Sequence, residues 1–163
     1  MLFETIVIVI YSASLLMIFA YALSQLNLLF NYLSNKKLEI THDLLDTSNP
    51  DEVPFVTIQL PVYNEKYVME RLLNNMALMD YPKDRFEIQV LDDSTDESVD
   101  TTSDQIKALQ KTGLDIQHVM RSDRSGFKAG ALKEGLKEAR GEFIAIFDAD
   151  FLPKSDWLRA TIP

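Results

Sequence analysis

The segment Phe143-Ile144-Ala145-Ile146-Phe147-Asp148-Ala149-Asp150 decides which fold this 163-residue chain can adopt. Its first five residues are apolar, a run typical of a fully buried strand in a parallel sheet. Residues two apart in a strand point to the same face, so Asp148 and Asp150 should project together, roughly 7 Å apart. At an effective dielectric of about 20, two charges at that separation repel by about 2.4 kcal/mol. A divalent cation with oxygen ligands would reverse that repulsion, whereas the alternative is a solvated acidic turn.

Working outward from this segment, apolar strand-like runs alternate with amphipathic helical segments along residues 55–163. We expect strands at Phe55–Leu60, Phe86–Leu91, Asp115–Met120 and Phe143–Phe147. Helices should lie between them, the last at Lys128–Ala139 with Leu132, Leu136 and Ala139 on one side. The alternation predicts an α/β fold with a mainly parallel sheet.

The N-terminal residues predict a membrane helix at 1–35. Thr5–Asn35 contains no charged side chain, and its apolar part, Ile6–Leu23, is near the minimum length for a hydrocarbon core about 30 Å thick. Lys36-Lys37 predicts a cytoplasmic C-terminal side, hence an N-terminus outside the cell (inner) membrane. The alternative is a signal peptide cleaved near Ala20-Tyr21-Ala22, but Glu4 is atypical of its n-region. Residues 36–54 should be a linker to the domain at 55–163.

Composition excludes several classes of site. There is no cysteine, so neither disulfides nor thiolate metal sites are possible, and the net charge of −9 argues against a nucleic-acid partner. Residues 39–123 carry 18 acidic and 7 basic side chains, whereas residues 124–163 carry 6 acidic and 7 basic ones. The chain becomes relatively basic where an anionic ligand is expected.

Polar groups follow all four predicted strands: Tyr63-Asn64-Glu65, Asp92-Asp93, Arg124–Lys128 and Asp148-Ala149-Asp150. Ligands of open parallel sheets bind at the carboxyl ends of the strands, so we expect these groups to form one site. Taken singly, each has a structural alternative: Asn64 or Asp96 would cap a helix, and the Asp92-Asp93 pair would be solvated.

The third of these segments suits a phosphate. Gly126 permits close backbone approach, and the N-terminus of the following helix offers free amides and a positive dipole end. Arg124 and Lys128 add cations suited to a diphosphate. Gly130 inside the helix costs about 1 kcal/mol relative to alanine, which indicates tight packing there.

Four motifs together resemble the family 2 glycosyltransferases, most closely the cellulose synthase-like and glucomannan synthase-like branch. They are Gln59-Leu60-Pro61-Val62-Tyr63-Asn64-Glu65, Leu91-Asp92-Asp93-Ser94-Thr95-Asp96, Gly126-Phe127-Lys128-Ala129-Gly130-Ala131-Leu132 and Phe147-Asp148-Ala149-Asp150. The resemblance covers essentially all of residues 55–163. It implies a partial GT-A (Rossmann-like) domain that binds a nucleotide-sugar donor (UDP- or GDP-linked) with Mg²⁺ or Mn²⁺, and a glycan or lipid acceptor at the membrane.

The resemblance also implies roles for individual residues. Tyr63 and Glu65 would border the nucleotide, and Asp92 or Asp93 would contact the base or ribose. Lys128 would approach the diphosphate; Asp148 and Asp150 would bind the metal, with Asp150 preferred as the direct ligand.

An inverting transfer also needs a carboxylate base, which in that family lies in a later Thr-Glu-Asp-type motif followed by Gln-x-x-Arg-Trp. Neither motif occurs here, so we expect a donor half-site within an N-terminal part of a longer enzyme or a truncated reading frame. Such a fragment would be inactive alone. Two alternatives stay open: a non-catalytic membrane-anchored nucleotide-binding module, and a phosphoacceptor domain using Asp148.

Overall fold

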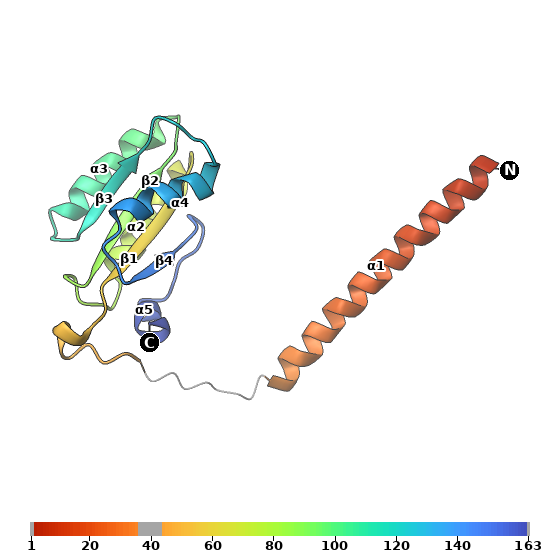
Figure 1. Cartoon of the computed structure of the whole chain (residues 1–163), viewed down its shortest axis with the longest axis horizontal. Coiled ribbons are helices and arrows are strands. Elements are labelled where there is room, and N and C mark those ends of the chain that lie inside the picture. Colours follow the sequence, from red (N-terminus) through yellow and green to blue (C-terminus); the bar gives the residue numbers. More distant parts are fainter. Residues whose placement is uncertain (1, 36–43, 163) are drawn as a thin grey trace. The chain divides into compact units, whose positions relative to one another are not determined.

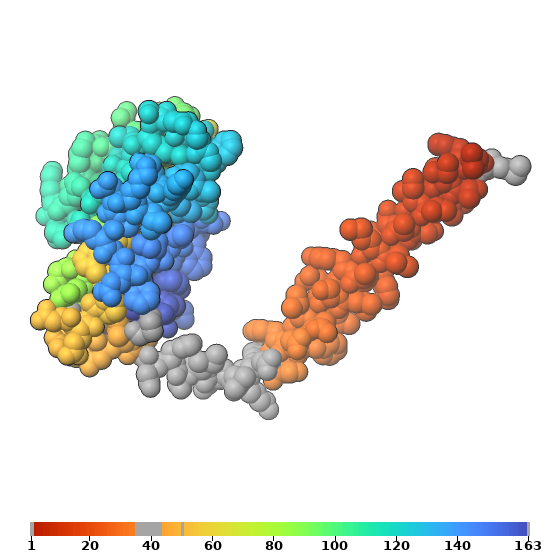
Figure 2. Space-filling view, in the orientation of Figure 1, coloured from red at the N-terminus to blue at the C-terminus, as the bar shows by residue number. Residues whose placement is uncertain are grey.

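The computed structural model describes residues 2–35 and 44–162, which fall into two separate units, residues 1–42 and residues 43–163 (Figure 1). The first unit is the helix α1, Leu2–Asn35. Its visible face in Figure 2 is covered by no other part of the chain, and none of the apolar stretch Leu2–Ser34 is buried. With a mean hydropathy of 2.4 and a length of about 51 Å, it is long and apolar enough to cross a membrane. A signal sequence meets the same criteria, so the membrane role stays a prediction. The first part of the predicted linker, residues 36–43, lies outside the described residues.

The second unit is a parallel sheet flanked by helices on both faces (Figure 1). A short 3₁₀ turn, Pro50–Glu52, precedes it. The strands are β1 (Val56–Val62), β2 (Phe86–Asp92), β3 (Ile116–Met120) and β4 (Phe143–Ile146), in the order β3-β2-β1-β4. The helices are α2 (Lys66–Ala77), α3 (Ser98–Gln110), α4 (Phe127–Glu138) and α5 (Trp157–Thr161). All three strand pairings are parallel, which confirms the predicted fold class.

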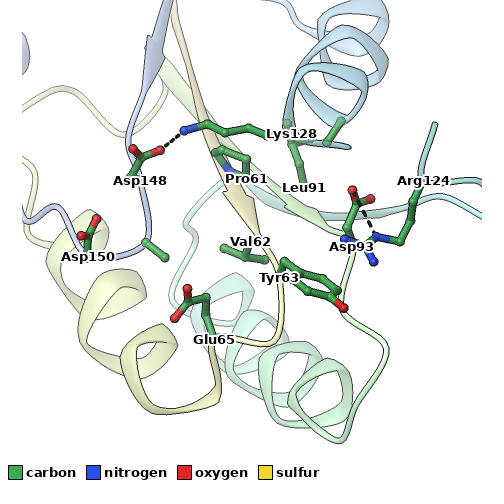
Figure 3. A pocket seen from close by; sticks show the side chains of 12 residues that line it. Pro61, Val62, Tyr63, Glu65, Leu91, Asp93, Arg124, Lys128, Asp148 and Asp150 are labelled. Carbon is green, nitrogen blue, oxygen red and sulfur yellow. Dashed lines mark hydrogen bonds and ion pairs between the residues drawn. The ribbon is translucent and has the colours of Figure 1, made fainter. Parts of the chain in front are cut away.

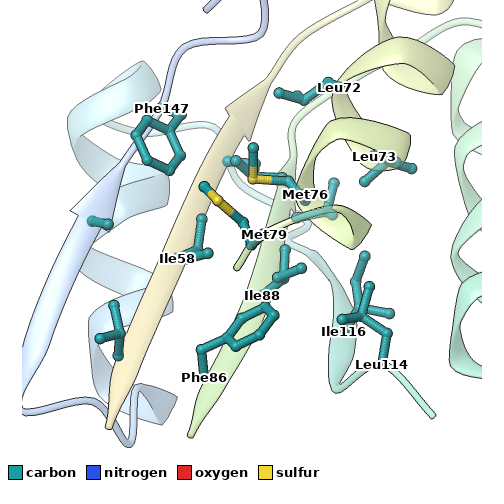
Figure 4. Packing of buried hydrophobic residues seen from close by; sticks show 14 of the residues in the cluster. Ile58, Leu72, Leu73, Met76, Met79, Phe86, Ile88, Leu114, Ile116 and Phe147 are labelled. Atoms are coloured by element: carbon teal, nitrogen blue, oxygen red, sulfur yellow. The ribbon is translucent and has the colours of Figure 1, made fainter. Parts of the chain in front are cut away.

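The hydrophobic core lies between the sheet and helix α2. Ile58 and Ile88 in the central strands are fully buried against Leu72 and Met76 of α2 (Figure 4). Period-2 alternation in the strands and 3.6-residue periodicity in the helix place these side chains on facing surfaces. This core fixes the carboxyl ends of β1 and β2 side by side.

The opposite face of the sheet, under α4, is polar. Thr57 Oγ1 donates to Glu87 Oε1 (2.6 Å), and Gln59 Nε2 donates to Gln89 Oε1 (3.0 Å) across β1 and β2. All four side chains are buried. A layer of hydrogen-bonded polar side chains therefore takes the place of apolar packing here, although the buried Gln89 Nε2 finds no hydrogen-bond partner among the described residues.

Helix α4 meets this layer with small residues. The predicted apolar face at Leu132, Leu136 and Ala139 was wrong, because Leu136 is 56% exposed while Ala131 and Gly135 are buried. A Cβ on Gly135 would lie 2.6 Å from Leu91 Cδ2, so only a glycine lets the helix approach this closely.

The prediction that the Phe143–Phe147 strand is fully buried was also wrong. Among the described residues β4 pairs with β1 alone, so it is an edge of the sheet. Ile146 is consequently 49% exposed. An apolar run does not distinguish a central strand from an edge strand, because both bury at least one face.

Candidate functional site

An open cleft of about 340 Å³ lies at the carboxyl ends of β1, β2 and β4 (Figure 3). Its charged and aromatic lining comes from Tyr63, Glu65, Asp93, Arg124, Lys128, Asp148 and Asp150. Four segments that are distant in sequence thus converge, as the strand-end argument predicts. The cleft brings together every predicted site residue except Asp92.

The end of β4 keeps strand-like alternation after its last ladder residue. Phe147 and Ala149 are buried, whereas Asp148 and Asp150 are exposed and both line the cleft. Phe147 is held by an edge-on contact with Trp157, with ring centroids 4.9 Å apart. This buried aromatic anchor turns both carboxylates toward the same opening (Figure 3).

The two carboxylates have different partners. The ammonium group of Lys128, in the first turn of α4, contacts Asp148 Oδ1. Asp150 forms no hydrogen bond or ion pair with any of residues 2–35 and 44–162. Asp150 is therefore the carboxylate that is free to accept a cation.

Asp92 and Asp93 point to opposite sides, because β2 continues one residue further than predicted. Asp92 is buried, with His118 Nε2 2.9 Å from its Oδ2 and the Ser94 amide donating to Oδ1 at 2.9 Å. Burial raises the pKa of Asp92, but the hydrogen bonds from His118 and Ser94 outweigh it and hold the pKa below its ordinary value. Asp92 does not line the cleft.

Asp93 does line the cleft, and it accepts two hydrogen bonds from Arg121 in a bidentate arrangement. Arg121 Nε donates to Oδ1 (2.7 Å), and a terminal guanidinium nitrogen donates to Oδ2 (2.6 Å). Arg124 Nε lies 3.9 Å from Asp93 Oδ2. The alternative of a solvated Asp92-Asp93 pair was wrong, since both residues are more than nine-tenths buried.

Tyr63 and Arg124 form a stacked pair at one wall of the cleft. The Arg124 guanidinium lies 3.8 Å from the centre of the Tyr63 ring, within cation–π range. Hydrogen bonding to Thr95, and secondarily to Arg124, lowers the pKa of the Tyr63 hydroxyl. The pair offers a flat, cationic surface of the kind on which a nucleobase stacks.

Asn64 ties the β1 loop to the β2 loop. It adopts a positive φ of 55°, its amide donates to Ser94 Oγ (2.8 Å), and its Oδ1 accepts from the Thr95 amide (2.9 Å). The structural alternative for Asn64, a helix cap, was wrong, because the N-cap residue of α2 is Glu65. Asp96 is not the N-cap residue of α3 either, since that residue is Glu97, but its Oδ1 accepts from the amide of Ser98, the first residue of the helix, at 3.0 Å.

Sequence reasoning missed Arg121 and His118. Arg121 directly follows β3, so the strand-end argument applied three residues earlier in the chain would have included it. His118 lies within the strand, and nothing in its local pattern indicates that it faces Asp92.

The carboxylate oxygens in the cleft are suitable ligands for a divalent cation that also binds a phosphorylated ligand. No group of three His, Cys, Asp or Glu side chains suited to a metal occurs in the part of the chain that the structure describes. Asp148 and Asp150 nevertheless share one opening, and Mg²⁺-type ions are commonly held by one or two carboxylates plus substrate phosphates. The residues therefore suit a metal bound together with a diphosphate.

A parallel sheet with acidic and cationic groups at its carboxyl ends defines an α/β domain, a class in which ligands bind outside the carboxyl ends of the strands. Residues 57–163 match the model of Glycosyl transferase family 2. The chain belongs to this family, which confirms the resemblance seen in its motifs.

Relatives with known names agree with this assignment. The chain is 46% identical over 114 residues to the "Probable glucomannan 4-beta-mannosyltransferase 11" of Oryza sativa subsp. japonica, covering 68% of this chain and 20% of the relative. It is 39% identical over 131 residues to the "Glucomannan 4-beta-mannosyltransferase 9" of Arabidopsis thaliana, covering 78% and 24% respectively. The chain thus spans about a fifth of the length of the curated relatives that it matches.

Solved structures show the same fold. The mannosyltransferase PcManGT from Pyrobaculum calidifontis, in complex with GDP-Man and Mn²⁺, is 33% identical with a TM-score of 0.58, covering 80% of this chain and 39% of that one. S. aureus TarS 1-349 in complex with UDP-GlcNAc is 32% identical with a TM-score of 0.50, covering 59% and 26%. These likenesses confirm the predicted GT-A architecture for the sheet and its helices.

Proposed function

We propose that this chain carries the donor half-site of a membrane-anchored inverting glycosyltransferase, which transfers a hexose from a nucleotide sugar to a glycan or lipid acceptor. The observation that carries the proposal is the single cleft that joins a stacked Tyr63–Arg124 pair, a lysine and two carboxylates. These groups suit the successive parts of a nucleotide sugar: the stacked pair suits the base, the lysine suits the diphosphate, and the carboxylates suit the cation bound to it. The named relatives favour GDP-mannose as the first donor to test and a polysaccharide as the acceptor.

Each side chain has a proposed role. Tyr63 and Arg124 stack on the base, Glu65 borders the nucleotide, and Asp93 accepts hydrogen bonds from the base or ribose. Lys128 exchanges its contact with Asp148 for one with the diphosphate. Asp148 and Asp150 hold Mg²⁺ or Mn²⁺. When bound, the metal stabilises the charge that develops on the departing diphosphate.

The described cleft contains no group that we assign as the acceptor base. Glu65, its remaining carboxylate, borders the nucleotide in this scheme. Deprotonation of the acceptor hydroxyl is therefore assigned to a carboxylate beyond residue 163, as the family resemblance implies. Helix α1 is the proposed anchor in the cell membrane, with the N-terminus outside and the cleft on the cytoplasmic side.

Titration calorimetry of the full chain in mild detergent tests the donor site. GDP-mannose and UDP-glucose are each titrated with and without Mn²⁺, into the unmodified chain and into Asp150→Asn. The substitution should weaken Mn²⁺-dependent binding at least tenfold, about 1.4 kcal/mol, because it removes the free carboxylate. Asp104→Asn is the matched control, since this side chain on α3 is 81% exposed and is not part of the cleft.

Different outcomes separate the alternatives. No binding of either donor by the unmodified chain would contradict the proposal. Binding that survives Asp150→Asn unchanged would remove the metal from the scheme. A longer chain that binds the donor without transferring its sugar would favour a non-catalytic nucleotide-binding module.

A further inference from the structure

Arg121, the first residue after β3, forms a four-point clamp at the rim of the cleft. Its Nε and one terminal nitrogen donate to the two carboxylate oxygens of Asp93, at 2.7 and 2.6 Å. Its other terminal nitrogen donates to the Ser125 carbonyl (2.8 Å), and the first also donates to the Phe127 carbonyl (2.8 Å). Only 14% of the side chain is exposed. Arg121 thus ties the end of β2 to the loop at residues 124–128.

That loop has a backbone that needs external support. Gly126 and Phe127 adopt positive φ angles of 75° and 48°, and a left-handed conformation is unfavourable for phenylalanine. The Phe127 side chain is 72% exposed, so packing does not hold it in place. Its carbonyl is instead held by Arg121, and the next residue is Lys128.

Gly130 shows how closely the clamp fits against α4. A Cβ at this position would lie 2.0 Å from the Ser125 carbonyl oxygen and 2.5 Å from Nη1 of Arg121. The tight packing predicted at Gly130 is therefore packing against the clamp. Any larger residue must move the loop or the guanidinium.

We propose that Arg121 is a positioning residue that presents Arg124 to the base and Lys128 to the diphosphate by fixing the backbone of residues 124–128. This inference rests on the donor site proposed above. Asp93 anchors the clamp, and since a carboxylate has about four acceptor positions it keeps capacity for the ligand as well. Lysine cannot replace Arg121, because a single ammonium group cannot reproduce the planar fork that spans Asp93 and two carbonyls.

Two measurements on the full chain test the clamp. The first is calorimetric affinity for GDP and UDP with Mn²⁺, and the second is hydrogen exchange of the backbone amides of Phe127 and Gly130, which are bonded to Arg124 O and Gly126 O. Arg121→Gln, Arg121→Lys and Gly130→Ala should each weaken the tighter-binding nucleotide at least tenfold. All three should also speed exchange of these amides at least tenfold. Lys133→Gln, which removes a cation from exposed α4 surface near Arg121, should stay within twofold.

The variants distinguish positioning from charge. Full affinity in Arg121→Lys would mean that only the charge matters, and would overturn the proposal. Unchanged affinity in Arg121→Gln would also overturn the positioning proposal, but it would not contradict the proposed donor site. Gly130→Ala keeps every charge and should keep the helix, so it decides the question if Arg121→Gln does not fold. If the unmodified chain binds neither nucleotide, the donor-site proposal fails, and amide exchange alone then decides whether Arg121 orders the loop.

Discussion

The Lys128 ammonium group contacts the Asp148 carboxylate and so bridges the first turn of α4 and the end of β4 (Figure 3). Both side chains are more than half exposed, and such surface ion pairs contribute about 0–1 kcal/mol. The contact is therefore easily exchanged for a ligand. In the proposed scheme the ion pair breaks when a diphosphate binds Lys128 and a cation binds Asp148.

Replacing Lys128 by glutamine should change the affinities for the nucleotide and for the metal in opposite directions. We expect GDP to bind about tenfold more weakly, a loss of about 1.4 kcal/mol, because a phosphate loses its cation. Mn²⁺ alone should bind more tightly, because Asp148 becomes free beside Asp150. Calorimetry measures both, with Lys154→Gln as an exposed control outside the cleft. A loss of both affinities would show that Lys128 supports the structure instead.

Glu87 should make folding sensitive to acid. Burial raises the pKa of this carboxyl, but the hydrogen bonds from Thr57 and Arg140 outweigh it and place the pKa below its ordinary value. A depressed folded pKa gives stability that is present above the unfolded value and lost as pH falls through the folded value. Urea unfolding should therefore show declining stability from about pH 5 downward.

The substitution Glu87→Gln tests that assignment. It should lower the free energy of unfolding at pH 7 by about 1.5–3 kcal/mol, because the charge-assisted hydrogen bonds between Glu87 and Arg140 are lost while Arg140 keeps Asp115 as a partner. It should also flatten the pH dependence between about pH 5 and 3. Glu134→Gln, at an exposed ion pair with Lys137, should change neither. Equal slopes in the Glu87 variant and the unmodified chain would contradict the role given to Glu87.

Gly135→Ala should destabilise the domain although alanine favours helices by about 1 kcal/mol. The new Cβ would lie 2.6 Å from Leu91 Cδ2 and 2.8 Å from Gln59 Nε2, so α4 must move away from the polar layer. Overpacking of this kind costs about 1–3 kcal/mol, which leaves a net loss of about 1 kcal/mol. Urea unfolding checks this, with Leu136→Ala on the exposed face of the same helix as control. Higher stability in Gly135→Ala would mean that the helix is free to shift.

Helix α1 should anchor the chain in membranes. Leu15→Lys with Leu16→Lys should release the chain from vesicles in alkaline carbonate, since each lysine at a helix centre costs about 2.5–3.5 kcal/mol. Leu2→Lys, at the helix end, should remain bound because its long side chain reaches the interface. Intact-mass measurement of the chain recovered from cells tests the alternative: loss of the first 22 or so residues would identify a signal peptide.

Local pattern was enough to predict several features. The order of strands and helices follows from hydrophobic periods of 2 and 3.6, which each segment carries by itself. The shared orientation of Asp148 and Asp150 is equally local, because two residues of strand return a side chain to the same face. The polar strand ends, combined with the rule for parallel sheets, predicted the cleft and its position.

Other features depend on partners far away in sequence, and only the tertiary structure decided them. One further residue of β2 turns Asp92 toward His118 and leaves Asp93 in the cleft. The clamp of Arg121 on Asp93 spans 28 residues, and the edge position of β4 depends on which strands pair with it. Which residues of α4 are buried depends on a polar layer supplied by two other strands. Residue type and spacing thus determined what chemistry the cleft contains, whereas long-range packing determined which side chains reach it.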